Sequence, residues 1–206
     1  ISASQLKTYR RCPKLWWFTK IRKLPEAGGS SYGATFGSVF HRVAERYLKQ
    51  EDPYPLGWSA SLQKGDADKI KWLLTEGIEQ KMLTIQEDSK IEHPFKVNLM
   101  KGVDISGIID FLISGEVIDH KTAKTMQYVL NEEQLAKDLQ MLIYAKIAIG
   151  DKDEITLRHN VFCRFPLKAK PTRTTVTKEQ IEDNWKGIQV TASGMLETSK
   201  ETEAPD

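Results

Sequence analysis

The residues with the clearest chemical potential lie in the segment GIIDFLISGEVIDHKTAKT, numbered 107–125. Two aspartates and a lysine, Asp110, Asp119 and Lys121, interrupt an otherwise hydrophobic pattern. Paired carboxylates suit Mg²⁺, which binds one or two of them and fills its octahedron with water and phosphate oxygens. A nearby ammonium can hold or help to deprotonate an attacking water and offset charge in the transition state. The alternative, with equal weight, is a structural Asp–Lys ion pair.

A β-hairpin would bring these side chains together. The Ser-Gly dipeptide at 114–115 is a turn signal between two apolar runs, so pairing on either side of it opposes Asp110 to Asp119. Side chains directly opposed in a sheet lie about 5 Å apart at Cβ, where like charges are destabilising. Because side chains alternate along a strand, Lys121 shares the face of Asp119, and the His120 side chain points the other way.

Two helical segments carry further candidates. GSVFHRVAE places His41 and Glu45 one turn apart on one helical face, and QMLIY does the same for Gln140 and Tyr144. Taken singly, such residues are more often satisfied core or surface groups than ligands. Their order and spacing relative to the two aspartates give them weight.

The elements that must position these residues follow the order helix, three strands, helix, strand. That order predicts an α/β fold with a mixed sheet and helices on both faces. A first helix, capped by Ser2 or Ser4, should be bent or split at Pro13. The periodicity predicts helices at 5–21, 35–50, 66–85, 132–149 and 178–196, and strands at 90–100, 103–113, 116–122, 154–165 and 173–177, with a loop at 26–33.

Length and composition favour one domain. The chain has 206 residues, 40% hydrophobic and 28% charged. We expect a single domain at 1–197, with 1–31 as a basic and aromatic helical segment packed on it and 198–206 as a disordered tail. Two cysteines cannot form a disulfide framework, which favours a reducing compartment, and the most apolar helical run is too short to span a bilayer. The expected location is the cytoplasm of a bacterial or phage-infected cell.

Five short patterns, in one order and with compatible gaps, resemble the RecB-type branch of the PD-(D/E)XK nuclease superfamily, close to its CRISPR-associated exonucleases. SASQLKTYRRCPKLWWF is similar to S-x-S-x-L-x-x-Y-x-x-C-P, GSVFH to G-x-x-x-H, GIID to G-x-x-D, VIDHKT to the D-x-K signature and QMLIY to Q-x-x-x-Y. The resemblance covers nearly the whole domain. It implies a restriction-endonuclease-like αβββαβ core with an added N-terminal helical segment, and phosphodiester hydrolysis with one or two Mg²⁺ or Mn²⁺ ions, leaving 5′-phosphates.

The resemblance also implies roles for single residues. His41, Asp110, Asp119 and the backbone carbonyl of His120 would bind the metal, and Glu45, one turn from His41, would support it or hold a second ion.

Lys121 would position the nucleophilic water, while Gln140 and Tyr144 would support the site and the substrate phosphate. Some relatives bind an iron-sulfur cluster through four cysteines. This chain has only Cys12 and Cys163, so we expect no cluster.

The N-terminal segment interleaves basic and aromatic residues, although the net charge is only +2. Such a mixture suits single-stranded DNA, whose backbone binds cations and whose bases stack on aromatic rings. The candidate DNA-binding residues are Lys7, Arg10, Arg11, Lys14 and Trp16.

The leading hypothesis is therefore a metal-dependent DNA exonuclease acting on single-stranded or resected ends in recombination or repair, with a single-strand annealing or recombination protein as a partner. The alternatives within the class are a structure-specific endonuclease and the nuclease module of a helicase-nuclease. From other classes come a non-catalytic DNA-binding scaffold and a zinc hydrolase, which would leave Lys121 without a role. His93 and His159 receive no function.

Overall fold

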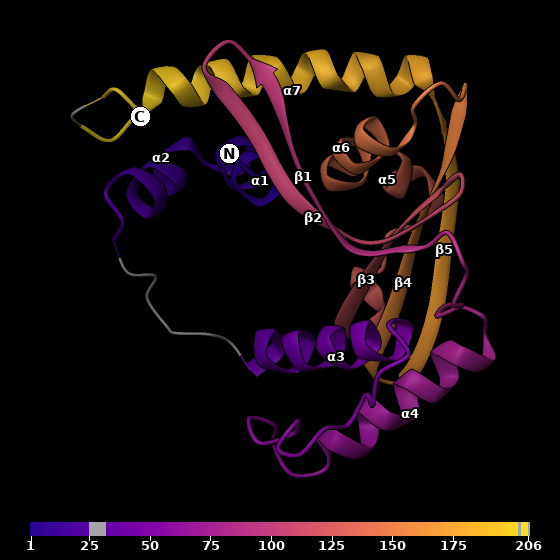
Figure 1. The fold of residues 1–206 in the computed structure, drawn as a ribbon. Coiled ribbons are helices and arrows are strands. Elements are labelled where there is room, and N and C mark those ends of the chain that lie inside the picture. The colour runs from indigo at the N-terminus through magenta and orange to yellow at the C-terminus, as the bar shows by residue number, and fades with distance from the viewer. Residues whose placement is uncertain (25–31, 202, 206) are drawn as a thin grey trace.

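The computed structural model describes residues 1–24, 32–201 and 203–205. It contains a five-stranded mixed sheet in the order β1-β2-β3-β4-β5, as Figure 1 shows. The pairs β1–β2, β2–β3 and β4–β5 are antiparallel, and β3–β4 is parallel. The strands are β1 (Lys90–Met100), β2 (Val103–Ile113), β3 (Glu116–Thr125), β4 (Glu154–Phe165) and β5 (Leu167–Thr177). The predicted mixed α/β architecture is confirmed.

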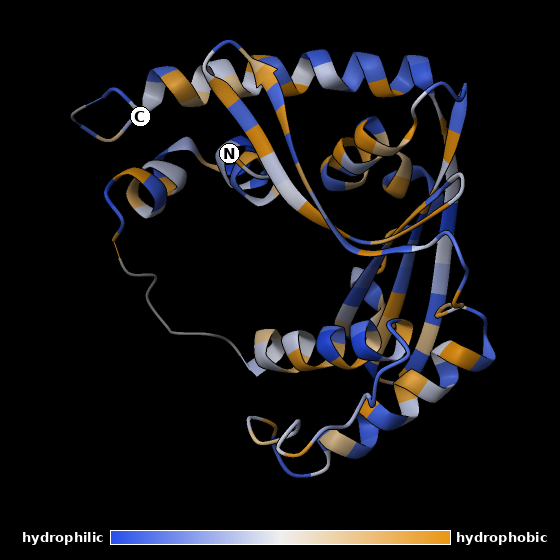
Figure 2. Cartoon of the chain, viewed as in Figure 1, coloured by the Kyte–Doolittle hydropathy of each residue, from blue (hydrophilic) through white to orange (hydrophobic). Residues whose placement is uncertain are grey.

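Helices cover both faces of the sheet, because each face carries its own apolar cluster. One cluster joins α1 (Ala3–Arg11), α6 (Leu139–Ala148) and α7 (Lys178–Thr198) to the sheet, and the other joins α3 (Tyr32–Leu48) and α4 (Asp66–Glu79). Figure 2 colours α6 largely hydrophobic, as expected for a helix enclosed between the sheet and α7. Shorter elements are α2 (Pro13–Trp16), the π-helical turn η1 (Trp17–Ile21), the 3-10 turn η2 (Met126–Tyr128) and α5 (Glu132–Ala136).

The helix expected at 132–149 is wrong in one respect, because the structure divides it into α5 and α6. Asp138 lies at the break in an extended backbone conformation. Its Oδ1 accepts hydrogen bonds from the backbone nitrogens of Gln140 at 3.0 Å and Met141 at 3.1 Å. An aspartate that caps a new helix competes with continuation of the old one. Apolar periodicity alone does not reveal this competition.

The N-terminal helix behaves as its sequence predicts. Ser2 caps α1 by accepting from the nitrogen of Gln5, and Pro13 opens α2 after a break at Cys12. The Cys12 sulfur accepts from the nitrogen of Leu15, so this thiol caps a helix. Most of the loop expected at 26–33 lies outside the described residues.

The final strand is longer than expected. The sequence predicts a strand only at 173–177, but β5 begins at Leu167 and pairs with β4 along its length. Its first half contains Lys168, Lys170 and Pro171, which hide a strand pattern. Charged residues and proline are common on such an edge strand, where they discourage pairing with other chains.

The two ends of the chain lie close together, as Figure 1 shows. The hydroxyls of Tyr9 and Thr198 are 2.9 Å apart, and Trp17 Nε1 donates to the carbonyl of Glu201 at 3.3 Å. The domain limits at 197 and 198 stay predictions. None of the helices within the described ranges combines the length and apolar character that crossing a lipid bilayer demands.

Candidate active site

The site forms where β2 separates from β3. The predicted register is confirmed for three pairs, which join 113 to 116, 112 to 117 and 111 to 118. The ladder ends there, so Asp110 and Asp119 are its first unpaired position rather than a directly opposed pair. The backbone nitrogen of His120 instead donates to Oδ2 of Asp110 at 2.8 Å. Beyond Ile118 the β2–β3 ladder therefore stops, and a side-chain contact from Asp110 replaces the backbone pairing.

The β1–β2 hairpin curves away from the other strands toward α7, as Figure 1 shows. Gln189 Nε2 on α7 donates to the carbonyl of Leu99 at 2.8 Å, which fixes the far end of the hairpin. This curvature separates Asp110 from the ladder while keeping it beside β3.

On β3, Lys121 and Asp119 share a face, as predicted. Lys121 Nζ lies 2.7 Å from Asp119 Oδ2 and 3.2 Å from Gln140 Oε1. Gln140 Nε2 lies 3.0 Å from Asp119 Oδ1 and 2.8 Å from the hydroxyl of Tyr144. Gln140 on α6 thus contacts both the carboxylate and the ammonium of β3, and Tyr144 on the same helix contacts Gln140.

The His120 side chain lies on the opposite face, also as predicted. Its ring packs near Phe111 and Phe162, and its Nδ1 is 3.3 Å from Asn160 Nδ2. Burial, followed by the proximity of His41, Arg158 and Lys121, lowers the pKa of His120 to about 3. Its imidazole is therefore a neutral part of the core, which leaves the backbone of His120 as its link to the site.

His41 on α3 reaches the site from the other side of β3. Its Nδ1 is 3.5 Å from Asp110 Oδ2, and it interacts with the backbone of His120. Burial lowers the pKa of His41, although Asp119 opposes this shift. A neutral imidazole is the form that binds metal ions.

Burial and mutual proximity shift the pKa values of the charged groups in the site. Burial and then the proximity of Asp119 raise the pKa of Asp110 to about 8. Burial opposes the charge on Lys121, but the attraction and hydrogen bond of Asp119 together with Asp110 outweigh it, so the pKa of Lys121 is raised. Lys121 is consequently a cation at neutral pH and not a free base.

The donor set fits a hard divalent cation. Two carboxylates, a neutral imidazole and a backbone carbonyl are ligands that Mg²⁺ and Mn²⁺ accept. Burial and then the neighbouring Asp119 raise the pKa of Asp110 despite the presence of Lys121, so a further cation at this position would favour the ionised carboxylate. Within the described residues, no three His, Cys, Asp or Glu side chains already meet at one point, so binding would require these side chains to adjust.

Comparisons with known proteins agree with this geometry. Residues 1–155 match the family described as the PD-(D/E)XK nuclease superfamily, a span that contains all the site residues above. The chain belongs to this superfamily. No curated protein sequence matches it.

Among solved structures, the nuclease superposes on a "putative exonuclease" from Eubacterium rectale with a TM-score of 0.69 at 11% identity, covering 100% of this chain and 83% of the other. At this identity the likeness concerns the fold. A second structure, that of SSO0001, gives a TM-score of 0.36 at 14% identity and covers 94% and 83% of the two chains. The superfamily generally uses divalent metal ions.

The carboxylate of Glu45, a candidate metal-site residue, is engaged in an ion pair. Lys49 Nζ lies 2.5 Å from Glu45 Oε1, one turn further along α3. Another acid, Glu92 on β1, adds to the negative charge near Glu45. Burial and then the proximity of Glu45 raise the pKa of Glu92.

Glu92 is a residue that sequence reasoning missed. It has a φ of 49° within β1 and falls between the pairs Ile91–Phe111 and His93–Ile109, hence beside Asp110. A non-glycine residue in this left-handed conformation is strained and is often found at functional sites. No pattern in the sequence marks it, because strand alternation assumes regular backbone.

His159 is the second missed residue. It was given no function, yet the parallel pairing of β3 with β4 sets it beside Asp119. Its Nε2 is 3.6 Å from Asp119 Oδ2, and its side chain is 6% exposed. Only the strand pairing brings the two residues together, since they are 40 positions apart.

The basic N-terminal residues are partly engaged within the protein. Lys7 Nζ pairs with Asp138 at 2.9 Å, and Arg10 bonds to α7 through Thr191 and the carbonyl of Gly187. Arg11 and Lys14 are exposed. These two therefore remain the more available cations of the segment.

Trp16 requires a correction. Its side chain is 4% exposed, lies against Tyr9 in an edge-on contact and belongs to the core. It cannot present a ring face to a base. Large aromatic residues favour burial because of their apolar area, and the same composition therefore suits a core or a stacking surface.

Proposed function

We propose that this nuclease is a Mg²⁺- or Mn²⁺-dependent DNA exonuclease that hydrolyses phosphodiester bonds at single-stranded or resected ends and leaves 5′-phosphates. The observation that carries the proposal is the network in which Lys121 bonds to both Asp119 and Gln140 beside Asp110 and His41. A structural ion pair would need neither the glutamine nor a second buried carboxylate.

In this proposal His41, Asp110, Asp119 and the carbonyl of His120 hold the metal. The bound ion would polarise the scissile phosphate and lower the pKa of a bound water. Glu92 lies beside Asp110 and Glu45 lies near Glu92, and these two acids would support the metal or hold a second ion.

Lys121 acts as a fixed cation, because its raised pKa keeps it protonated. It orients the attacking water through hydrogen bonds and offsets the charge that develops on the phosphate oxygens. Gln140 keeps the ammonium and Asp119 aligned, and Tyr144 holds Gln140 through its hydroxyl. The proton of the water must pass to solvent or to the substrate phosphate.

The biological setting that we propose is recombination or repair in the cytoplasm of a bacterial or phage-infected cell, with a single-strand annealing or recombination protein as a partner. Its support is the resemblance to RecB-type nucleases. Exposed Arg11 and Lys14 are the N-terminal residues best placed to contact DNA.

The test is digestion of linear single- and double-stranded DNA, labelled at either end, with Mg²⁺, Mn²⁺ or EDTA. Loss of end label should require metal and should disappear in Asp119→Ala and Lys121→Ala. Lys186→Ala on α7, whose partner is Asp183 on the surface, is the matched control. Cleavage of circular single strands would favour an endonuclease, and DNA binding without cleavage would favour a scaffold.

A further inference from the structure

We propose that the cavity beside Lys121 is a nucleotide subsite, in which Tyr128 stacks on a base and Lys124 binds a phosphate of the strand next to the scissile bond. This inference rests on the proposed nuclease function. The cavity would bind the part of the substrate strand adjacent to the scissile phosphate.

The cavity adjoins the catalytic residues. Its volume is about 390 Å³, and Lys121 and His159 are in its wall. Pockets of about 300 to 1,000 Å³ accommodate small-molecule ligands, so a nucleotide fits. The end of β3 and η2 contribute Lys124 and Tyr128 to the wall, and apolar residues that follow η2 form another part of it.

The ring of Tyr128 is accessible to a ligand. Its side chain is 69% exposed, and no hydrogen bond or ring contact engages it within the described residues. An exposed, unpartnered aromatic ring in the wall of a cavity next to the candidate catalytic residues suits the stacking of an unpaired base, and each stacked base contributes about 1 to 3 kcal/mol. The 3-10 turn η2 directly follows β3, so the backbone of Tyr128 lies close to the end of the strand that carries Lys121.

The charge of the cavity favours an anion. Lys121 is already paired with Asp119 at 2.7 Å. Lys124 is therefore the cation in the wall that carries uncompensated charge, since it is exposed and forms no ion pair with the described residues. Asp138 is the acid in the wall, and Lys7 neutralises it at 2.9 Å. The remaining net positive charge suits a phosphate group.

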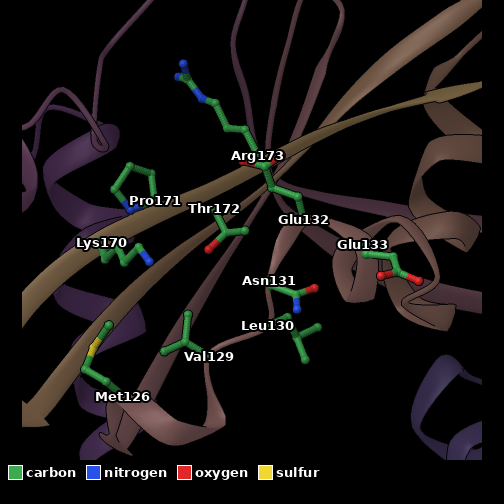
Figure 3. A pocket seen from close by; sticks show the side chains of 10 residues that line it. All are labelled: Met126, Val129, Leu130, Asn131, Glu132, Glu133, Lys170, Pro171, Thr172 and Arg173. Carbon is green, nitrogen blue, oxygen red and sulfur yellow. The ribbon is translucent and has the colours of Figure 1, made fainter.

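A larger cavity over β5, of about 700 Å³, is a weaker candidate. Figure 3 shows its lining, which contains Lys170 and Arg173 but also Glu132 and Glu133. Its opposite charges balance, and Arg173 points away from Lys170 toward Glu116, to which its Nε lies at 3.2 Å. It also lacks a catalytic residue, and so we place the strand in the smaller cavity.

The experiment measures binding of a fluorescein-labelled oligothymidylate by anisotropy in EDTA, where no cleavage occurs. Tyr128→Ala should weaken binding by about 5- to 100-fold, whereas Tyr128→Trp should bind within about threefold of the wild type, because it keeps a stacking face. Lys124→Ala should weaken binding and reduce the slope of log affinity against log salt by about 0.7. Trp72→Ala and Lys186→Ala, on exposed surfaces of α4 and α7, should bind as the wild type does.

Binding by Tyr128→Ala and Lys124→Ala equal to that of the wild type would overturn the subsite. Digestion assays run in parallel separate this failure from failure of the proposed function. A wild type that cleaves DNA while both variants bind normally refutes only the subsite. A wild type that does not cleave, yet binds through Tyr128 and Lys124, refutes only the nuclease activity. Thermal unfolding of each variant verifies that these exposed substitutions leave the fold intact.

Discussion

His159 on β4 lies beside Asp119 on β3, with Nε2 of the imidazole 3.6 Å from Oδ2 of the carboxylate. Both side chains are nearly inaccessible to solvent, at 6% and 1% exposure. Nε2 has no hydrogen-bond partner of standard geometry among the described residues. The imidazole therefore lies against the same carboxylate oxygen that Lys121 contacts at 2.7 Å, and it limits the directions in which Asp119 can turn.

His159 should consequently position Asp119 for metal binding. Replacement of a residue that orients a metal ligand typically lowers affinity by about 10- to 100-fold. We expect His159→Ala to weaken Mn²⁺ binding in this range, measured by calorimetry, and His159→Gln to recover part of the loss. Equal affinities in wild type and His159→Ala, with an unchanged melting temperature, would show that His159 only fills space.

Lys121→Ala should separate catalysis from metal binding. Loss of one preorganised donor to the transition state costs about 100- to 1,000-fold in kcat. Mn²⁺ affinity should stay equal or increase, because the ammonium that competes for Asp119 is gone. A matched measurement on Lys186→Ala should show neither change, and a large loss of Mn²⁺ affinity in Lys121→Ala would contradict the assigned role.

Metal binding should strengthen as pH rises. The pKa of Asp110 is raised from its ordinary 3.8 to about 8, so a proton must leave before the carboxylate binds a cation. Mn²⁺ affinity, measured by calorimetry from pH 6 to pH 9, should increase and then level off above about pH 8. In Asp110→Asn the affinity should be low and nearly independent of pH over the same range.

The metal-free protein should respond to pH in the opposite sense. Because the folded state holds the Asp110 proton more tightly than the unfolded state, this carboxyl stabilises the fold fully below pH 3.8. The contribution is lost progressively as pH rises toward about 8. Urea unfolding in EDTA should show less decline over this window in Asp110→Asn. An identical decline in both proteins would argue against the raised pKa.

Asp138 should stabilise the fold more through its helix cap than through its ion pair with Lys7. Asp138→Ala removes the cap that bonds to the nitrogens of Gln140 and Met141, and loss of such a cap costs about 0.5 to 2 kcal/mol of unfolding free energy. Lys7→Ala removes only the exposed partner and should cost under about 1 kcal/mol. Urea denaturation of both variants tests the difference, and a larger effect in Lys7→Ala would contradict it.

The sequence alone was enough to predict most of the local elements and the faces on which the candidate site residues lie. The turn at 114–115 and strict alternation fixed the β2–β3 register, and with it the shared face of Asp119 and Lys121, because both depend on neighbouring residues only. Helical spacing paired Gln140 with Tyr144 for the same reason. The motif resemblance supplied the link between these segments.

Tertiary structure decided what depends on distant contacts. The curvature of the β1–β2 hairpin ended the ladder before Asp110, and strand pairing placed His159 beside Asp119. The division of the helix at 132–149 is instead local, because Asp138 caps nitrogens only two and three residues away. Burial removed Trp16 from the candidate DNA surface. For the hairpin, His159 and Trp16, the sequence offered two locally acceptable states, and packing against residues far along the chain selected one.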